Sequence, residues 1–110
     1  MTTHEPHSTN FIGGGATSPL WCQTMADVLG CTFHQVHDPV LANARGAALI
    51  AAVALGDLDW ADIPARVRID ASYEPDRAKR ATYDHQGRTL SALYRKNRGI
   101  YARHNGPRPT

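Results

Sequence analysis

The chain has 110 residues, of which 42% are hydrophobic and 20% are charged, and its net charge is +2. This length allows one small domain with a modest core and excludes an enzyme built from two lobes with a cleft between them. The longest apolar run, residues 47–55, has nine residues, whereas a membrane-spanning helix needs ~20. Two cysteines, Cys22 and Cys31, are too few for a disulfide framework, so a cytoplasmic protein with reduced thiols is expected.

The charges are unevenly distributed along the chain. Residues 1–76 carry three basic and nine acidic side chains, whereas residues 77–110 carry nine basic and one acidic. Such a basic segment can bind nucleic acid or a membrane surface, but a solvated helix face has the same composition. The sequence favours the solvated face, so neither nucleic acid nor a membrane is expected as a partner.

The first expected elements are a strand and a helix joined by glycines. Residues 1–10 lack apolar periodicity and predict an irregular leader, with a short strand ending at Phe11 and Ile12. Ser18 followed by Pro19 predicts a helix start, because serine caps well and proline at the first helical position loses no hydrogen bond. The helix should end at Gly30. Its apolar stripe, which we expect to face the core, consists of Leu20, Trp21, Met25, Val28 and Leu29.

The remaining segments predict one more strand, two helices and an extended stretch. Residues 31–36 are rich in β-formers and predict a strand. Residues 40–55 are apolar on nearly all faces and predict a buried helix, in which Arg45 pairs with an acidic residue or a carbonyl. Residues 66–74 alternate between apolar and polar, which indicates a half-buried extended segment. Residues 77–103 predict a long polar helix with a narrow apolar seam of Tyr83, Leu90, Tyr94 and Tyr101.

This order predicts a layered α/β fold with two core strands, flanking helices and a long C-terminal helix. No metal site is expected in it. His34 and His37 are three residues apart on a predicted strand, so their side chains should point to opposite faces and cannot share one ion. Cys22 is expected to be a packed thiol and not a reactive one.

The segment most informative about function is the glycine turn, which we define as residues 13–17. A strand enters it and a capped helix leaves it, and a helix start presents free N–H groups and a partial positive charge to an anion. Glycines let a phosphate approach the backbone closely, because no Cβ stands in the way. The pattern is neither a Walker A loop nor GxGxxG. On its own it is explained equally well by a plain strand-to-helix connection.

A resemblance makes the motif more specific. The stretch GGGATSPLWCQTMADVLG is similar to the nucleotide-binding segment of the FGGY carbohydrate kinases, in particular the xylulose kinase branch. The stretches DPVLANARGAALIAAVALG, YEPDRAKRATYD and LSALYRKNRGIYARHN resemble later parts of the same family. The resemblance covers residues 11–105 and leaves residues 106–110 as a tail.

The resemblance implies an actin-like, ribonuclease H-like ATPase lobe that holds ATP or ADP with Mg²⁺ and serves phosphoryl transfer to a sugar hydroxyl. By position, Gly14, Gly15 and Ala16 match backbone beside the α-phosphate and adenosine, and Gly13 shapes the approach. Ser18 and Pro19 match the surroundings of the adenine ring.

The resemblance also implies what the chain lacks. The catalytic aspartate, the magnesium ligands and the sugar-binding residues lie upstream in the family, so no catalytic residue is predicted in this chain. The chain should be inactive alone, should meet a sugar only together with an N-terminal lobe, and should be able to form oligomers. The alternative is a small non-enzymatic protein whose basic C-terminal helix binds nucleic acid or a protein partner.

Overall fold

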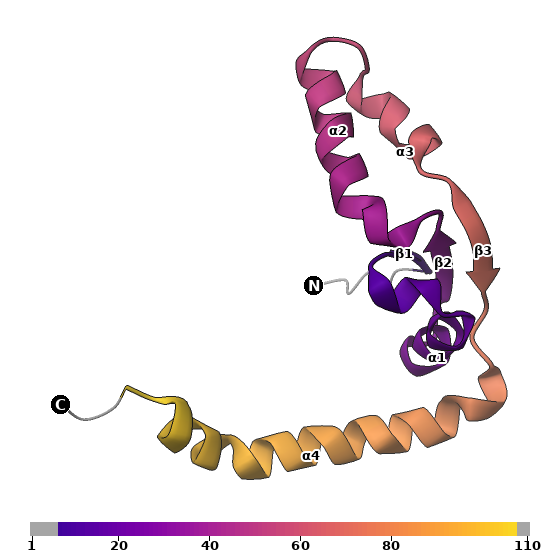
Figure 1. Cartoon of the computed structure of the whole chain (residues 1–110). Coiled ribbons are helices and arrows are strands. Elements are labelled where there is room, and N and C mark those ends of the chain that lie inside the picture. Colours follow the sequence, from indigo (N-terminus) through magenta and orange to yellow (C-terminus); the bar gives the residue numbers. More distant parts are fainter. Residues whose placement is uncertain (1–6, 108–110) are drawn as a thin grey trace. The chain divides into compact units, whose positions relative to one another are not determined.

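The computed structural model describes residues 7–107. They form two compact units, one reaching to Arg77 and one beginning at Ala78. The first unit contains the sheet and the shorter helices, and the second contains the long C-terminal helix (Figure 1). The predicted α/β class, with flanking helices and a long C-terminal helix, is confirmed.

The sheet of the described residues has three strands, β1 (Ser8–Phe11), β2 (Thr32–Val36) and β3 (Ile69–Tyr73). β2 lies in the centre, parallel to β1 and antiparallel to β3. The parallel pair is connected through α1 (Pro19–Leu29), as a parallel pair requires a crossover. β3 therefore pairs with the edge of β2 opposite to β1.

Two strand assignments differ from the sequence prediction. β1 begins at Ser8, inside the stretch 1–10 expected to be an irregular leader, because pairing with β2 and not apolar composition makes it a strand. The extended segment 66–74 contributes β3, so the sheet has a third strand beyond the two predicted ones. Residues 1–6 of the expected leader and 108–110 of the expected tail lie outside the described residues.

The core of the first unit lies where α1 packs on β2. Its buried apolar residues are Ala16, Cys22, Ala26, Phe33 and Val36. The rings of Phe11 and Phe33 meet edge to face with centroids 5.6 Å apart, a geometry worth about 0.5–1.5 kcal/mol beyond the area it buries. This ring pair joins β1 to β2 immediately before the glycine turn.

The face that α1 turns inward is not the predicted one. Trp21 is 57% exposed, and Leu20, Val28 and Leu29 are also exposed. The buried face consists instead of Cys22, Ala26 and Asp27. Small side chains at Cys22 and Ala26 allow the helix backbone to approach the sheet closely, which the larger residues of the predicted stripe would prevent.

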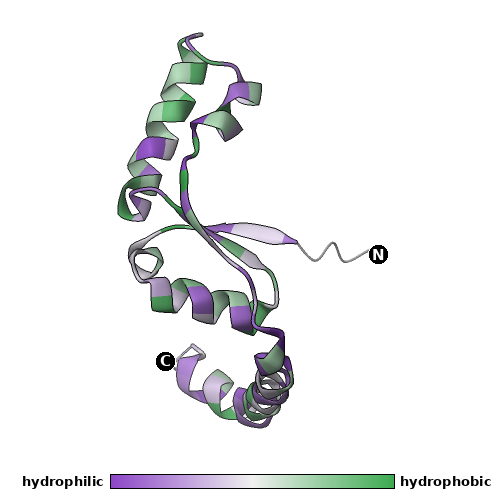
Figure 2. Cartoon of the chain, turned by 90° about the vertical axis from the view of Figure 1, so that its right-hand side faces the viewer, coloured by the Kyte–Doolittle hydropathy of each residue, from purple (hydrophilic) through white to green (hydrophobic). Residues whose placement is uncertain are grey.

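Helix α2 (Ala42–Ala54) follows a 3-10 turn at Pro39–Leu41. It ends in a Schellman motif: Gly56 has φ 84°, its N–H donates to the carbonyl of Val53, and the N–H of Asp57 donates to that of Ala52. The prediction that this helix is buried is wrong, since none of its residues is buried and Ile50 is exposed. Figure 2 shows hydrophobic residues along much of this helix.

A short connection returns the chain from α2 to the sheet. A 3-10 turn at Trp60–Asp62, closed by a capping box between Asp59 and Asp62, leads into α3 (Ile63–Arg66). β3 follows two residues after α3. This agrees with the turn of helix expected between the alanine-rich helix and the extended segment.

Helix α4 (Arg80–Asn105) forms the second unit, after a 3-10 turn at Arg77–Lys79. The long polar helix is thus confirmed, with its end two residues beyond the predicted one. Arg80 and Asp84 form an i,i+4 ion pair at 2.8 Å, and such partly exposed pairs contribute about 0.3–0.5 kcal/mol. Leu90, Tyr94 and Tyr101 of the predicted seam are exposed. In the described part of the chain, no helix is long and apolar enough to cross a membrane.

Candidate functional site

The glycine turn begins with a backbone conformation that only glycine adopts readily. Gly13 has φ 86° and ψ −174°, a region that side chains with a Cβ avoid. Gly14–Thr17 then form one turn of 3-10 helix, and the Thr17 hydroxyl donates to the Gly14 carbonyl at 2.7 Å. The chain therefore leaves β1, reverses at Gly13 and enters α1 within seven residues.

Two adjacent backbone N–H groups of this turn have no recorded hydrogen-bond partner within residues 7–107. Gly13 N–H donates to the Pro39 carbonyl at 2.8 Å, and Ala16 N–H donates to the Gly13 carbonyl at 3.1 Å. The structure records no hydrogen bond from the N–H groups of Gly14 and Gly15, and both residues are exposed. Two adjacent N–H donors of this kind suit an anion.

Gly14 and Gly15 differ in how much space a side chain would have. A Cβ built on Gly14 would meet no atom within 4 Å, whereas one on Gly15 would lie 3.3 Å from Cζ of Phe11. A methyl group at Gly14 would therefore point into open space. Gly14→Ala should therefore leave the fold undisturbed.

The predicted cap of α1 is confirmed. Ser18 has extended backbone angles, and its Oγ accepts a hydrogen bond from the Trp21 N–H at 3.4 Å. Pro19 is the first residue of the helix and is exposed. Ser18 and Pro19 thus follow directly after the glycine turn in the chain.

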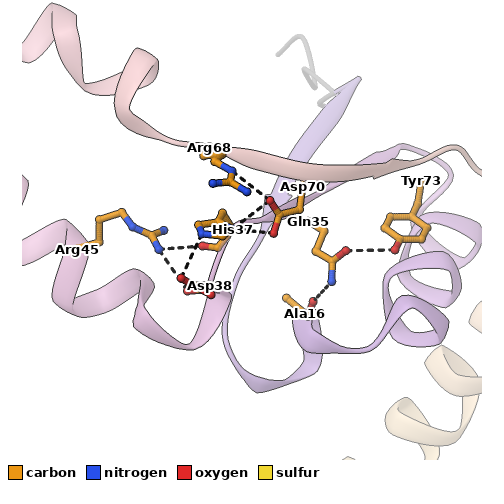
Figure 3. A network of polar contacts seen from close by, with 8 residues as sticks. All are labelled: Ala16, Gln35, His37, Asp38, Arg45, Arg68, Asp70 and Tyr73. Atoms are coloured by element: carbon orange, nitrogen blue, oxygen red, sulfur yellow. Dashed lines mark hydrogen bonds and ion pairs between the residues drawn. The ribbon is translucent and has the colours of Figure 1, made fainter.

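Ala16, unlike the other predicted site residues, is fully buried. Its carbonyl accepts a hydrogen bond from Nε2 of Gln35 at 2.7 Å, and the Tyr73 hydroxyl donates to Oε1 of Gln35 at 3.2 Å (Figure 3). The Cys22 thiol also donates to this carbonyl, at 3.7 Å. Burial raises the pKa of the Cys22 thiol, and a hydrogen bond with the backbone of Cys22 itself lowers it by less. The hydrogen bond of Ala16 with Gln35 therefore fixes the turn to β2, and Tyr73 links Gln35 to β3.

A second group of side chains fixes the other end of the turn. The His37 ring lies between two carboxylates, with Nδ1 2.9 Å from Oδ2 of Asp70 and Nε2 3.2 Å from Oδ2 of Asp38 (Figure 3). Arg45 of α2 donates to the His37 carbonyl at 2.8 Å. The sequence predicted a pairing of Arg45 with an acidic residue or a carbonyl, and the structure shows the carbonyl. The cluster holds the segment that leads to Pro39, whose carbonyl accepts the Gly13 N–H.

The charge of Asp70 is stabilised in this cluster. Its hydrogen bond with His37 lowers the pKa of the Asp70 carboxyl, desolvation acts in the opposite direction, and the charges of His37 and Arg68 lower it further. Arg68 lies 3.4 Å from Asp70 through its Nε atom. Asp70 is therefore the anionic centre to which both His37 and Arg68 are attracted.

Sequence reasoning missed Gln35, Tyr73 and Asp70. Gln35 was detectable as a polar residue in the middle of a strand of β-formers. Tyr73 and Asp70 had no local signal, because their partners Gln35 and His37 are 38 and 33 residues away in the chain.

The glycine turn offers hydrogen-bond donors but no side chain for proton transfer. Residues 13–19 contain no titratable side chain, so the turn itself can position an anion through N–H groups but cannot act as a general acid or base. Within residues 7–107, no group of three His, Cys, Asp or Glu side chains is arranged to hold a metal ion. His34, the other member of the HxxH pair, hydrogen-bonds through Nδ1 to Oγ of Ser72 at 2.7 Å.

Comparison with known proteins relates this geometry to a family. Residues 2–55 match the FGGY family of carbohydrate kinases, C-terminal domain. The xylulose kinase of Staphylococcus epidermidis is 28% identical over 102 residues, which cover 90% of this chain and 20% of that protein. The autoinducer-2 kinase of Salmonella typhimurium (strain LT2) is 34% identical over 96 residues, covering 82% of this chain and 17% of that protein.

A solved structure supports the same relationship. The crystal structure of xylulose kinase from Rhodospirillum rubrum has a TM-score of 0.64 and 37% sequence identity, covering 86% of this chain and 19% of that chain. The chain thus spans about a fifth of the length of the relatives that it matches. The sequence match includes the glycine turn and α2. The chain belongs to the FGGY family of carbohydrate kinases and corresponds to part of their C-terminal domain.

Proposed function

We propose that this chain supplies the adenine-nucleotide surface of an ATP-dependent sugar kinase. The observation that carries the proposal is the pair of exposed N–H groups at Gly14 and Gly15, in the segment that matches the FGGY family. An ADP or ATP phosphate would lie over these two groups, and the adenine would lie beside Ser18 and Pro19. Gly13 gives the turn its shape, and Ala16 supports it from the buried side.

The proposed reaction is transfer of the ATP γ-phosphate to a sugar hydroxyl. Phosphoryl transfer depends mainly on positioning and on electrostatic stabilisation, which backbone N–H groups can provide without a general base. Mg²⁺ would neutralise charge on the phosphates when bound. The described residues offer no cluster of ligands for it, so we propose that its ligands, the catalytic base and the sugar site belong to another part of the kinase and that this chain alone does not turn over sugar.

Titration of the 110-residue chain with Mg-ADP, followed by ¹⁵N NMR, tests the proposal directly. We expect the amide signals of Gly14 and Gly15 to shift and to saturate. In Gly14→Ala, the added methyl group stands in the approach, so affinity should fall about tenfold, which corresponds to about 1.4 kcal/mol. The matched control is Gly46→Ala, where the new Cβ also meets nothing within 4 Å but lies in α2.

The outcomes separate cleanly. Saturable shifts at the turn that weaken in Gly14→Ala and persist in Gly46→Ala support the proposal. Equal affinity in all three proteins, or shifts confined to other parts of the chain, would place the nucleotide elsewhere. An ADP-release assay with a panel of pentoses accompanies the titration, and turnover by the chain alone would overturn the proposed division of the active site.

A further inference from the structure

The neutral and the protonated ring of His37 cannot form the same hydrogen bonds with the carboxylates around it. Both of its ring nitrogens face carboxylates, Asp70 at 2.9 Å and Asp38 at 3.2 Å. A neutral imidazole has one N–H donor and one lone pair, whereas an imidazolium has two donors. Only the protonated ring can therefore donate to both carboxylates, and a neutral ring turns a lone pair toward one of them.

The Asp70 carboxylate reaches His37 because β3 contains a bulge. Gln35 pairs with Ala71 and Val36 pairs with Ile69, so Asp70 is an extra residue without an opposite partner on β2. Bulges redirect the side chain of the extra residue and are often found beside functional sites. The His37 N–H also donates to the Arg68 carbonyl at 2.9 Å, which keeps the two strands paired beyond the bulge.

The Asp38 carboxylate belongs to the turn that holds Gly13. Asp38 has φ 43°, the left-handed region that aspartate and asparagine tolerate better than most residues. The next residue, Pro39, accepts the Gly13 N–H at 2.8 Å. A contact between His37 and Asp38 therefore acts one residue away from the hydrogen bond that fixes the start of the glycine turn.

We propose that His37 is a pH-responsive positioning residue for the glycine turn, which it holds through Asp38 and Pro39 while Asp70 fixes its ring. The inference rests on the proposed function of that turn in nucleotide binding and adds its regulation. The charged groups around the ring are Asp38 from the turn, Arg45 from α2, Asp70 from β3 and Arg68 from the residue before β3 (Figure 3). Histidine is the side chain that most commonly changes charge between pH 5 and 8. The contact of His37 with Asp38, which positions the glycine turn, is therefore stronger at acidic than at alkaline pH.

Hydrogen exchange of the Gly13 amide, measured by NMR on the whole chain at pH 6 and pH 8, tests this without any nucleotide. Protection is expressed relative to unprotected peptides at each pH and to the amides of β2. We expect protection of Gly13 to fall about threefold to tenfold between pH 6 and pH 8, the range for a partly exposed charged hydrogen bond. In His37→Ala it should be low at both pH values.

Two variants distinguish this role from general stabilisation. His34→Ala removes the other strand histidine, which bonds to Ser72 and not to the turn, and should behave as wild type at Gly13. Asp38→Asn keeps a residue that tolerates the left-handed backbone, and its amide can donate to a neutral ring or accept from a charged one. Asp38→Asn should therefore retain protection of Gly13 and lose the pH dependence.

Mg-ADP titration of the same proteins at both pH values separates the two hypotheses. Comparing each variant with wild type at one pH cancels the titration of ADP itself. Two outcomes overturn the role of His37 even where ADP binds. One is that protection of the Gly13 amide in wild type does not change with pH, and the other is that His34→Ala and His37→Ala lose this protection equally. Responsive protection without ADP binding confirms the His37 contact and refutes the proposed function of the turn instead.

Discussion

The backbone N–H of Asp76 donates a hydrogen bond of 2.8 Å to Oδ1 of Asp27, although 49 residues separate the two in the chain. Asp27 is only 3% exposed and lies near the C-terminal end of α1, where the helix dipole disfavours a negative charge. Gln23 also donates to this oxygen at 2.8 Å, and to the carbonyl of Glu74 at 2.8 Å. The carboxylate therefore ties the segment after β3 to α1.

Replacing Asp27 should destabilise the first unit strongly. In Asp27→Ala, the Asp76 N–H and the Gln23 amide lose this charged acceptor, and a hydrogen bond to a charged group contributes about 1.5–3 kcal/mol. Asp27→Asn keeps an oxygen that can accept and should cost less. Urea unfolding followed by circular dichroism measures both, with the exposed Asp57→Ala as control, which should change stability by less than about 0.5 kcal/mol. Equal stability of Asp27→Ala and Asp57→Ala would contradict this role.

Gly13→Ala should destabilise the fold through the backbone alone. A Cβ at Gly13 would meet nothing within 4 Å, but φ 86° with ψ −174° is a conformation that alanine adopts only at a cost of about 1–3 kcal/mol. Gly46→Ala, inside α2, should instead stabilise by about 0.5–1 kcal/mol. Thermal unfolding of the two variants beside wild type gives the sign of each. A neutral Gly13→Ala would show that the turn readily adopts another conformation.

Acidification should weaken the link between β2 and β3. The pKa of Asp70 is lower in the folded chain than its ordinary value, mainly through its hydrogen bond with His37. The unfolded chain therefore takes up the proton first as pH falls, so this contribution is complete above about pH 4 and is lost as pH drops through the lower folded value. Unfolding curves between pH 6 and pH 3 should show a smaller acid dependence in Asp70→Asn than in wild type. Superimposable pH dependences would argue against a stabilising role for this carboxylate.

The two thiols should react at different rates. Cys22 is fully buried and burial raises its pKa, whereas Cys31 is half-buried. Because the thiolate is the reactive form, Cys31 should react with a disulfide reagent at least about tenfold faster than Cys22. Single variants, Cys22→Ser and Cys31→Ser, assign the two phases. Fast labelling of Cys22 in a folded chain would mean that α1 opens readily from the sheet.

The boundaries of α1 were predictable because their signals are local. Ser18, Pro19 and Gly30 each act through backbone atoms within a few residues, so cap chemistry alone gave Pro19–Leu29. The strand-to-helix motif likewise led to the glycine turn. That this turn binds a nucleotide stays a prediction.

The inward face of α1 and the state of α2 were not predictable in this way. Periodicity identifies the most apolar side of a helix, but which side is buried depends on what the chain packs against it. In α1, the close approach to β2 selects Cys22 and Ala26, and the larger Trp21 remains exposed. In α2, Leu55 at the end of the helix is 78% exposed, because no second layer within the described residues covers it.

The bulge at Asp70 also gives the two edges of the sheet different properties. An open strand edge is a template onto which another strand can add, and bulges, charged residues and proline discourage that addition. The β3 edge carries the bulge with Arg68 and Asp70, and Pro75 follows it. The β1 edge, Ser8–Phe11, has none of these features. Among the described strands, addition of another strand is therefore discouraged at β3 and favoured at β1, so pairing between copies of the chain would begin at β1.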